Sequence, residues 1–263
     1  MRIKITLRPR SSKIIIPFNH NDYIIGFISQ ILKSIQNELR YRNDFRLLPF
    51  LRKSFRFFTF SRIMIPLRKR IETGFLMKCS KVHFFTSLIF PEQLKESFIE
   101  KIKNSRLYLG HPSKYFTIDQ IKVIKDPKFS DTMKFKTLSP IKCSIRTRFR
   151  HRRIVKYLLP GDKQLKERIR EVIIHKYRKL FGRDPKEKAF DFSIDEDYLK
   201  SVGGPDRIIR LITVKNWPSK ELKIKSFDAH FTLTGNPELI KLAYETGLGE
   251  DNRLGFGMIQ PVE

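Results

Sequence analysis

Hydrophobic and polar positions follow two different periods along the first half of the chain. From Arg2 to Leu7 every second residue is apolar, which is the period of a strand with one buried face. From Asn21 to Leu39 the apolar residues recur at helical spacing, and Asn21 or Asp22 can cap the start of this helix. The other elements expected in this half are strands at 55–60, 74–89 and 120–124 and a helix at 91–104. Their order, βαββαβ, is that of a ferredoxin-like unit.

The second half repeats this order of elements without an obvious repeat of sequence. A strand is expected over 134–145, and the apolar residues of 162–180 share one face of a helix. The remaining expected elements are strands at 189–194 with 207–214, at 223–233 and at 257–262, and a helix at 237–246. We therefore expect an α+β fold of two tandem ferredoxin-like (βαββαβ) domains, residues 1–127 and 128–263.

The charge of the chain indicates what kind of partner it has. Its 54 Lys and Arg residues outnumber 27 Asp and Glu residues, which gives a formal net charge of +27. Such a charge repels itself in the compact state, and a polyanion is the usual compensation, because phosphate contacts release counterions. No apolar run reaches the roughly 20 residues that cross a bilayer, so no membrane partner is expected. Nucleic acid is the leading candidate.

Cysteine and histidine usage bounds the compartment and the chemistry. Cys79 and Cys143 lie far apart and form neither a disulfide framework nor a zinc pattern, so we expect two small buried side chains. The six histidines form no pair at i,i+4 spacing. The N-terminus lacks the continuous apolar segment of a signal peptide. We expect a reducing cytoplasm and neither a metal nor a cofactor.

A run of basic residues follows the strand expected at 134–145. In an extended ribbon, alternation would put Arg146, Arg148, Arg150 and Arg152 on one face. A solvated face is the ordinary interpretation of such a run. No acidic residue is interleaved here, so the repulsion is uncompensated unless phosphates are bound. We therefore expect these four arginines and Arg153 to contact RNA.

Closely spaced glycines occupy the segment before the final expected strand. The segment reads Gly247-Leu-Gly249-Glu-Asp-Asn-Arg253-Leu-Gly255-Phe-Gly257. Glycines allow backbone N–H groups to approach a phosphate and tolerate positive φ, although an ordinary glycine-rich turn has a similar composition. The segment lies between a helix and a strand, so it is not a dinucleotide fingerprint. Gly247, Gly249, Arg253, Gly255 and Gly257 join the expected RNA contacts.

Four segments carry a resemblance to a known family. The pattern Gly-Leu-Gly-x(5)-Gly-Phe-Gly resembles the signature loop of the RAMP superfamily of CRISPR proteins. Thr137–Ile141, Pro17–Tyr23 and Phe57–Ser61 resemble, in order and spacing, segments of the CRISPR pre-crRNA repeat-processing endoribonucleases. The resemblance implies two ferredoxin-like domains that hold repeat RNA. It also implies cleavage without metal, in which the ribose 2′-OH attacks the adjacent phosphorus and leaves a 2′,3′-cyclic phosphate.

The same resemblance implies a catalytic Tyr, His and Lys that this chain lacks at the matching positions. Ser29 stands where the Tyr is expected, Asp44 where the His is expected, and Arg56 close to the Lys. Arginine has too high a pKa to act as a general acid or base, and a carboxylate opposes phosphate binding. His20 lies outside this triad, and we expect it to cap or pack the first helix. The weak candidates for a replacement site are Arg40, Tyr41, Lys53 and Arg56.

Three functions remain open at this point. The first is a metal-independent endoribonuclease that cleaves pre-crRNA within its repeats through a site without histidine. The second is a non-catalytic relative that only binds repeat RNA or crRNA, including as the RNA-holding subunit of a CRISPR effector complex. The third is a structural subunit of such a complex that packs against other RAMP proteins. The expected partners are CRISPR repeat RNA or crRNA and, for the second and third functions, other effector subunits. The chain is either a monomer or a homodimer.

Overall fold

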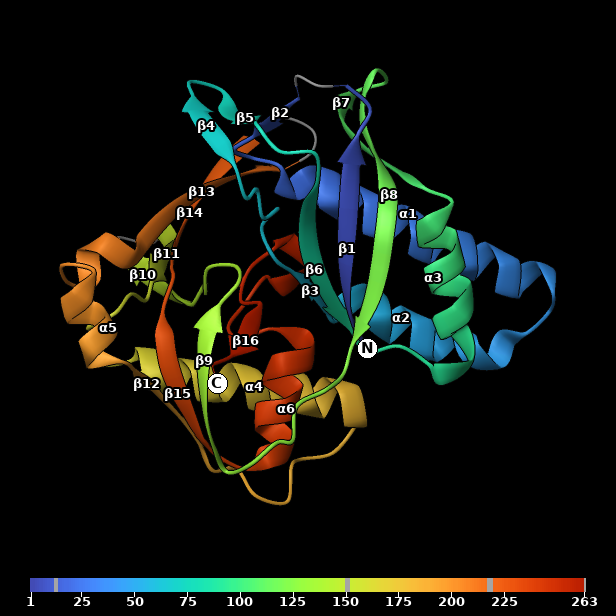
Figure 1. Ribbon diagram of the computed structural model, residues 1–263. Coiled ribbons are helices and arrows are strands. Elements are labelled where there is room, and N and C mark those ends of the chain that lie inside the picture. Colours follow the sequence, from blue (N-terminus) through green and yellow to red (C-terminus); the bar gives the residue numbers. More distant parts are fainter. Residues whose placement is uncertain (12–13, 150–151, 217–219, 263) are drawn as a thin grey trace. The chain divides into compact units, whose positions relative to one another are not determined.

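The computed structural model describes residues 1–11, 14–149, 152–216 and 220–262, with the backbone alone at 148–149, 152–153, 215–216 and 220–221. Its contacts divide the chain into two compact units, Met1–Lys125 and Asp126–Glu263. Each unit has its own sheet and its own helices (Figure 1). Among the described residues, no helix is long and apolar enough to cross a membrane.

The first unit is built on a five-stranded sheet in the order β3-β6-β1-β8-β7. Its strands are β1 (Arg2–Pro9), β3 (Phe58–Phe60), β6 (Val82–Leu88), β7 (Arg106–His111) and β8 (Lys114–Ile124). The central strand β1 pairs antiparallel with both neighbours, and Ile5 lies opposite Phe84 and Ile121. Ile3, Ile5 and Leu7 are buried, as the alternation predicted. The strands β1, β3, β6 and β8, with α1 (Asn21–Tyr41) and α3 (Lys95–Lys103) between them in the chain, have the βαββαβ order and confirm the ferredoxin-like prediction; β7 is an additional edge strand.

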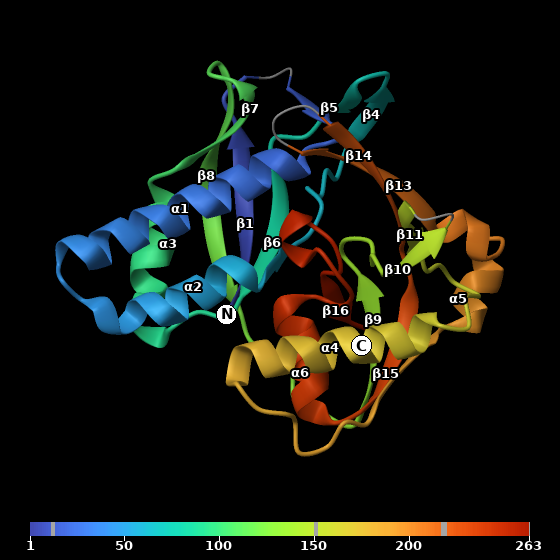
Figure 2. The same cartoon turned by 180° about the vertical axis from the view of Figure 1, so that it is seen from behind.

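Three helices belong to this unit: α1 (Asn21–Tyr41), α2 (Leu48–Arg56) and α3 (Lys95–Lys103). Figure 2 shows α1 and α3 lying across the sheet, with α2 joined to the end of α1. The strand expected at 55–60 is wrong in its first part, because α2 continues to Arg56. Pro49 suits the first turn of a helix, and Leu48, Leu51 and Ser54 bury one face of α2 at a spacing of three.

His20 joins the Pro17–Tyr23 segment to the chain just after β3. The residue is buried, its Nδ1 lies 3.0 Å from the Pro17 carbonyl oxygen, and its Nε2 accepts a hydrogen bond from the Ile63 N–H at 3.2 Å. Burial lowers the pKa of the imidazole to about 4, so the ring is neutral and can donate through Nδ1 while it accepts through Nε2. The packing role is therefore confirmed. His20 occupies the N-cap position in place of Asn21 or Asp22, and its side chain makes no capping bond.

The first unit also carries a three-stranded ribbon in the order β2-β5-β4. Its strands are β2 (Ile15–Pro17), β4 (Arg68–Ile71) and β5 (Gly74–Met77). The single strand expected at 74–89 is therefore wrong: β5 pairs in the ribbon and β6 pairs in the main sheet.

The second unit repeats the topology with different residues. Its sheet has the order β12-β15-β9-β16, and two helices pack on the sheet and on each other. These elements are β9 (Thr132–Thr137), β12 (Phe190–Ile194), β15 (His230–Gly235), β16 (Ile259–Pro261), α4 (Leu165–Phe181) and α6 (Pro237–Thr246). Phe135 and Phe231 face each other across β9 and β15 and stack with ring centroids 6.0 Å apart. The tandem ferredoxin-like fold is confirmed.

Two antiparallel ribbons and a short helix extend this unit. They are β10 (Ser144–Phe149) with β11 (Arg152–Tyr157), β13 (Ile209–Asn216) with β14 (Lys220–Phe227), and α5 (Glu196–Ser201). The continuous strand expected over 134–145 is wrong, because β9 ends at Thr137 and Pro140, which has no N–H to donate, follows. The strand expected over 223–233 divides at Asp228 and Ala229 into β14 and β15.

Candidate nucleic-acid interface

The glycine loop, residues 247–257, is bonded to the Thr137–Ile141 segment. The Leu138 N–H donates to the Met258 carbonyl at 2.7 Å, and the Gly257 N–H donates to the Pro140 carbonyl at 2.8 Å. The Met258 N–H donates to the Ser139 hydroxyl at 2.9 Å. Two segments that mark the family at opposite ends of this unit therefore form one structural feature.

Asn252 is the centre around which the glycine loop folds. Its Nδ2 donates to the carbonyls of Leu248 and Phe256, at 3.1 and 3.0 Å, and its Oδ1 accepts from Lys176 Nζ at 2.6 Å. Gly257 has φ +70°, and a Cβ there would lie 1.8 Å from the Leu248 carbonyl oxygen. Only glycine allows the backbone to pass this close to Asn252 and Leu248.

Most of the loop glycines serve this packing. The N–H groups of Gly247, Gly255 and Gly257 donate to the carbonyls of Ala243, Asn252 and Pro140, and all three glycines are buried. These N–H groups are already used within the protein, so their geometry does not support the expected role as phosphate donors. Gly249 is also buried, while Arg253 is exposed. RNA contact by the loop stays a prediction, and Arg253 is the exposed one among its five predicted contact residues.

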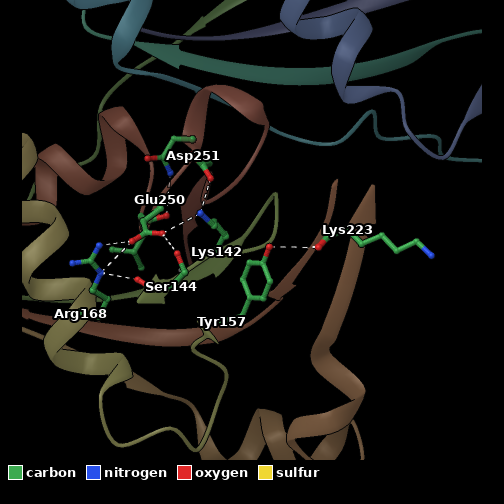
Figure 3. Close-up of polar contacts among 9 residues, drawn as sticks. Lys142, Ser144, Tyr157, Arg168, Lys223, Glu250 and Asp251 are labelled. Atoms are coloured by element: carbon green, nitrogen blue, oxygen red, sulfur yellow. Dashed lines mark hydrogen bonds and ion pairs between the residues drawn. The ribbon is translucent and has the colours of Figure 1, made fainter. Parts of the chain in front are cut away.

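A charged cluster lies between the glycine loop, α4 and the start of β10 (Figure 3). Glu250 is its centre: Oε1 accepts from Arg168 Nη2 at 2.6 Å, and Oε2 accepts from Ser144 Oγ at 2.6 Å. Lys142 Nζ lies 3.1 Å from Glu250 Oε2 and 2.6 Å from Asp251 Oδ2. We call Lys142, Ser144, Arg168, Glu250 and Asp251 the Glu250 cluster.

The cluster shifts the pKa values of its own members. Burial opposes the charged form of Glu250, but the bonds from Ser144 and Arg168 and the charge of Lys142 outweigh it and lower the pKa. Burial likewise opposes the charged form of Lys142, but Asp251 and Glu250 outweigh it and raise the pKa. Glu250 and Lys142 are therefore ionised at neutral pH, and the charge of Lys142 is largely neutralised by the carboxylates that contact it.

Lys176 and Cys143 are buried beside this cluster. Burial lowers the pKa of Lys176 to about 7, and its amine donates to the Gly247 carbonyl at 2.5 Å as well as to Asn252. A neutral amine has two N–H bonds, which matches these two acceptors. Burial raises the pKa of the Cys143 thiol to about 12, as expected of an inert buried cysteine. Cys79 is also a free thiol but is only half-buried, contrary to the expectation for it.

The basic ribbon differs from its prediction in one respect. Arg148 pairs with Arg153 and Phe149 pairs with Arg152, because β11 runs antiparallel to β10. Position 153 therefore shares a face with 146 and 148, and position 152 lies on the opposite face, which corrects the expected alternation. Arg146 is exposed. Arg150 and His151 lie outside the described residues, as do the side chains of 148, 152 and 153, and RNA contact by this ribbon stays a prediction.

The expected catalytic residues lie around the α1–α2 connector, which we define as residues 40–50. Arg40 and Tyr41 end α1, and the Tyr41 side chain is 90% exposed. Lys53 and Arg56 lie in the last turn of α2, with Lys53 Nζ 5.9 Å from the centre of the Phe50 ring. At 1.5 Å rise per residue, Arg56 lies about 12 Å along α2 from its start beside the connector. Arg56 therefore lies at the far end of α2 from the connector that holds Arg40 and Tyr41.

Other groups near the connector do not replace a histidine. Asp44 stands where the family histidine is expected. Its Oδ1 accepts a hydrogen bond from Arg46 Nε at 3.4 Å. Ser29 is half-buried within α1. In the described ranges, no three His, Cys, Asp or Glu side chains gather as metal ligands would.

Comparison with known families agrees with the fold and its loop. Two ferredoxin-like units with a glycine loop before the last strand define a protein of the RAMP class. The family description "CRISPR associated protein Cas6, C-terminal" matches residues 124–261, and "CRISPR-associated protein Cas6, N-terminal" matches residues 15–122. The chain belongs to the Cas6 family.

Individual relatives match along the whole chain. A Pyrococcus furiosus protein named "Putative CRISPR-associated endoribonuclease-like protein Cas6" is 30% identical over 267 residues, covering 100% of this chain and 99% of the relative. "CRISPR-associated endoribonuclease Cas6 1" of Methanocaldococcus jannaschii is 26% identical, covering 100% and 93%. A solved structure described as "An RAMP protein binding different RNA substrates" has a TM-score of 0.79 and 26% identity and covers 100% of both chains.

Proposed function

We propose that this chain binds the repeat RNA of a CRISPR transcript and cleaves it as an endoribonuclease. The observation that carries the proposal is the match of both units to the Cas6 family, whose relatives include a protein named as an endoribonuclease over the full length of this chain. The net charge of +27 supports a polyanionic substrate. A structural neighbour described as binding RNA supports the same substrate class.

The proposed chemistry is metal-independent attack of a ribose 2′-OH on the adjacent phosphorus. It needs a group that accepts the 2′-OH proton, a group that protonates the leaving 5′-oxygen, and cations beside the phosphorane. Tyr41 and Lys53 carry the only proton-transferring groups among the four expected residues. Arg40 and Arg56 can stabilise charge alone. Because Tyr41 is exposed, bound RNA would complete this site, as catalytic hydrogen bonds often tighten only in the substrate complex.

A second function is supported by a specific observation. The segment from Arg40 to Arg56 contains no histidine, and Arg56 lies at the far end of α2 from Arg40 and Tyr41. A relative at 30% identity is itself named "endoribonuclease-like". The alternative is therefore a chain that binds repeat RNA or crRNA without cutting it, alone or beside other effector subunits.

A cleavage assay in EDTA tests the two functions against each other. The full chain is incubated with repeat RNA from the CRISPR array of its own source, and the product ends are analysed. We expect a 2′,3′-cyclic phosphate and a 5′-OH, and Tyr41→Phe and Lys53→Met should each slow the reaction roughly 100-fold. Tyr108→Phe changes an exposed tyrosine of the same unit and serves as the matched control.

The other outcomes of this assay are equally decisive. Tight binding by the wild-type chain without cleavage over hours would establish the non-catalytic alternative. Absence of both binding and cleavage would overturn the proposed function as a whole. Light scattering of the same preparation, with and without RNA, decides between a monomer and a homodimer.

A further inference from the structure

A pocket of about 890 Å³ lies beside the Glu250 cluster, between the two ribbons of the second unit. Its volume is within the range of sites that hold a small organic molecule. Its apolar lining comes from side chains of β10, β11 and β14, among them Val155 and Leu222. Its polar lining is the Glu250 cluster with Tyr157 and Arg146, and Arg146 lies directly opposite Val155 in the β10–β11 register.

Two side chains of the apolar lining are exposed to solvent. Val155 is 52% exposed and Leu222 is 45% exposed, although each lies on a ribbon whose strands are already paired. Figure 3 shows Tyr157 between the Glu250 cluster and β14, and its hydroxyl lies 3.4 Å from the Lys223 carbonyl oxygen. The two ribbons therefore form apolar walls that can contact the faces of a flat ring.

The charges of the pocket decide which part of a nucleotide fits inside it. Lys142 and Arg168 are held by Glu250, Asp251 and Glu171, so they offer little net positive charge. The Asp251 side chain is 43% exposed, and its Oδ2 forms the ion pair with Lys142. A phosphate inside the pocket would be repelled by the two carboxylates. A base that carries an amino group would instead donate a hydrogen bond to Asp251.

Arg146, the cross-strand partner of Val155, has a different environment from Lys142 and Arg168. It is exposed, and among the described residues it makes no ion pair. An arginine here can bind the phosphate of a nucleotide whose base lies inside. The pocket thus offers a place for a base against Val155 with a place for a phosphate beside it on Arg146.

We propose that this pocket binds one unpaired nucleotide of the RNA, with its base between Val155 and Leu222, its amino group on Asp251 and its phosphate on Arg146. The base is adenine, cytosine or guanine, because uracil has no amino group. The inference rests on the proposed function and adds a residue-level determinant of sequence recognition to it.

Abasic scanning tests the proposal. Each nucleotide of the repeat RNA is replaced in turn by an abasic residue, and binding to the wild-type chain is measured. We expect one position at which the abasic RNA binds about tenfold more weakly, as for the loss of one stacked base. Replacing that base by uracil should weaken binding in the same direction.

A variant that fills the pocket completes the test. Leu222→Trp should bind intact RNA about tenfold more weakly, and the abasic change at the critical position should then have no further effect. Leu211→Trp is the matched control, because Leu211 is 58% exposed on the partner strand β13 and does not line the pocket. If Leu222→Trp does not fold, Val155→Trp fills the same pocket from the other ribbon.

The outcomes separate this proposal from the proposed function. If the filled variant binds as tightly as the wild type, or keeps the full abasic penalty, the pocket is not a base site while RNA binding stands. If the wild-type chain does not bind repeat RNA, both proposals fail. An equal loss in Leu211→Trp would also overturn the pocket, because the effect would not depend on it.

Discussion

The side chains that hold the glycine loop have partners within the protein, whereas the α1–α2 connector presents rings and arginines to solvent. Asn252 makes three hydrogen bonds, Lys176 two, and Glu250 is bonded by Ser144 and Arg168. In the connector, by contrast, the exposed aromatic side chains are Tyr41 at 90%, Phe45 at 58% and Phe50 at 53%.

This difference separates stability from activity. A buried, fully bonded loop has one arrangement, and a change in it acts on folding. The exposed side chains of the connector contribute little to folding, so a change in them acts on contact with a ligand. The family signature in the second unit is therefore a structural requirement, while the expected cleavage residues lie on a surface that RNA would have to organise. The following predictions test this contrast.

The largest effect is expected at Gly257. Gly257→Ala would place a Cβ 1.8 Å from the Leu248 carbonyl oxygen, so the loop must rearrange, at a cost of roughly 4 kcal/mol or more of unfolding free energy. Gly182→Ala is the control, because Gly182 has the same φ of +70° and nothing within 4 Å, so it should cost only about 1–2 kcal/mol. Urea unfolding measures both. Equal losses would mean that backbone strain alone explains the requirement for glycine.

The Glu250 cluster should show the next largest effect. Glu250→Gln keeps the shape but leaves Lys142 and Arg168 without their shared carboxylate, at a cost of about 3 kcal/mol at pH 7. The folded pKa of Glu250 is lowered, so its stabilising contribution is present above the unfolded pKa and is lost as pH falls through the folded value. The difference between variant and wild type should therefore shrink in acid. Glu171→Gln, at an exposed partner of Arg168, should cost no more than about 0.5 kcal/mol.

Lys176 should give the unfolding free energy a dependence on alkaline pH. Its folded pKa is about 7 and its ordinary value is 10.5, so between these values the unfolded chain binds a proton that the folded chain does not. Stability should therefore rise from about pH 7 to about pH 9, by up to about 1.4 kcal/mol per pH unit. Above about pH 9 the raised pKa of the Cys143 thiol acts in the opposite direction. Lys176→Met should remove this slope, whereas Lys179→Met, on the exposed face of α4, should keep it. A slope that survives in Lys176→Met would show that the buried amine is charged.

The smallest effect on folding is expected in the connector. Tyr41→Ala removes a side chain that is 90% exposed, so the unfolding free energy should change by no more than about 0.5 kcal/mol. The rate of RNA cleavage should nevertheless fall, as for Tyr41→Phe. A loss of more than about 1 kcal/mol would show that the connector is structural, like the glycine loop, and would end the contrast between them.

The sequence predicted the elements whose signal is local. The alternation from Arg2 to Leu7 and the helical spacing after Asn21 lie within single elements, so both were visible without tertiary information. Helix α2 was missed because its aromatic residues near Phe55 resemble a strand, while the turn around Pro49 gave the opposite signal. The ribbons were misjudged because a short break between two strands leaves little trace in the hydrophobic pattern.

The Glu250 cluster could not be predicted in the same way. Ser144 and Glu250 are 106 residues apart, and each belongs to a segment that is unremarkable by itself. Lys176 left one signal, because it stands on the apolar stripe of α4 formed by Ile169, Ile173 and Leu180. A lysine at such a position must find acceptors inside the protein.

The bond between Met258 and Ser139 joins residues 119 positions apart and has a consequence for how the protein is made. In each unit the first strand of the sheet pairs with the last, β1 with β8 and β9 with β16. Neither sheet can close until its final strand has left the ribosome, so each unit has a high contact order and folds late in its own synthesis. The first unit can close while the second is still being translated. A pause in translation once β8 has emerged from the ribosome would therefore let the first unit close before the second is complete.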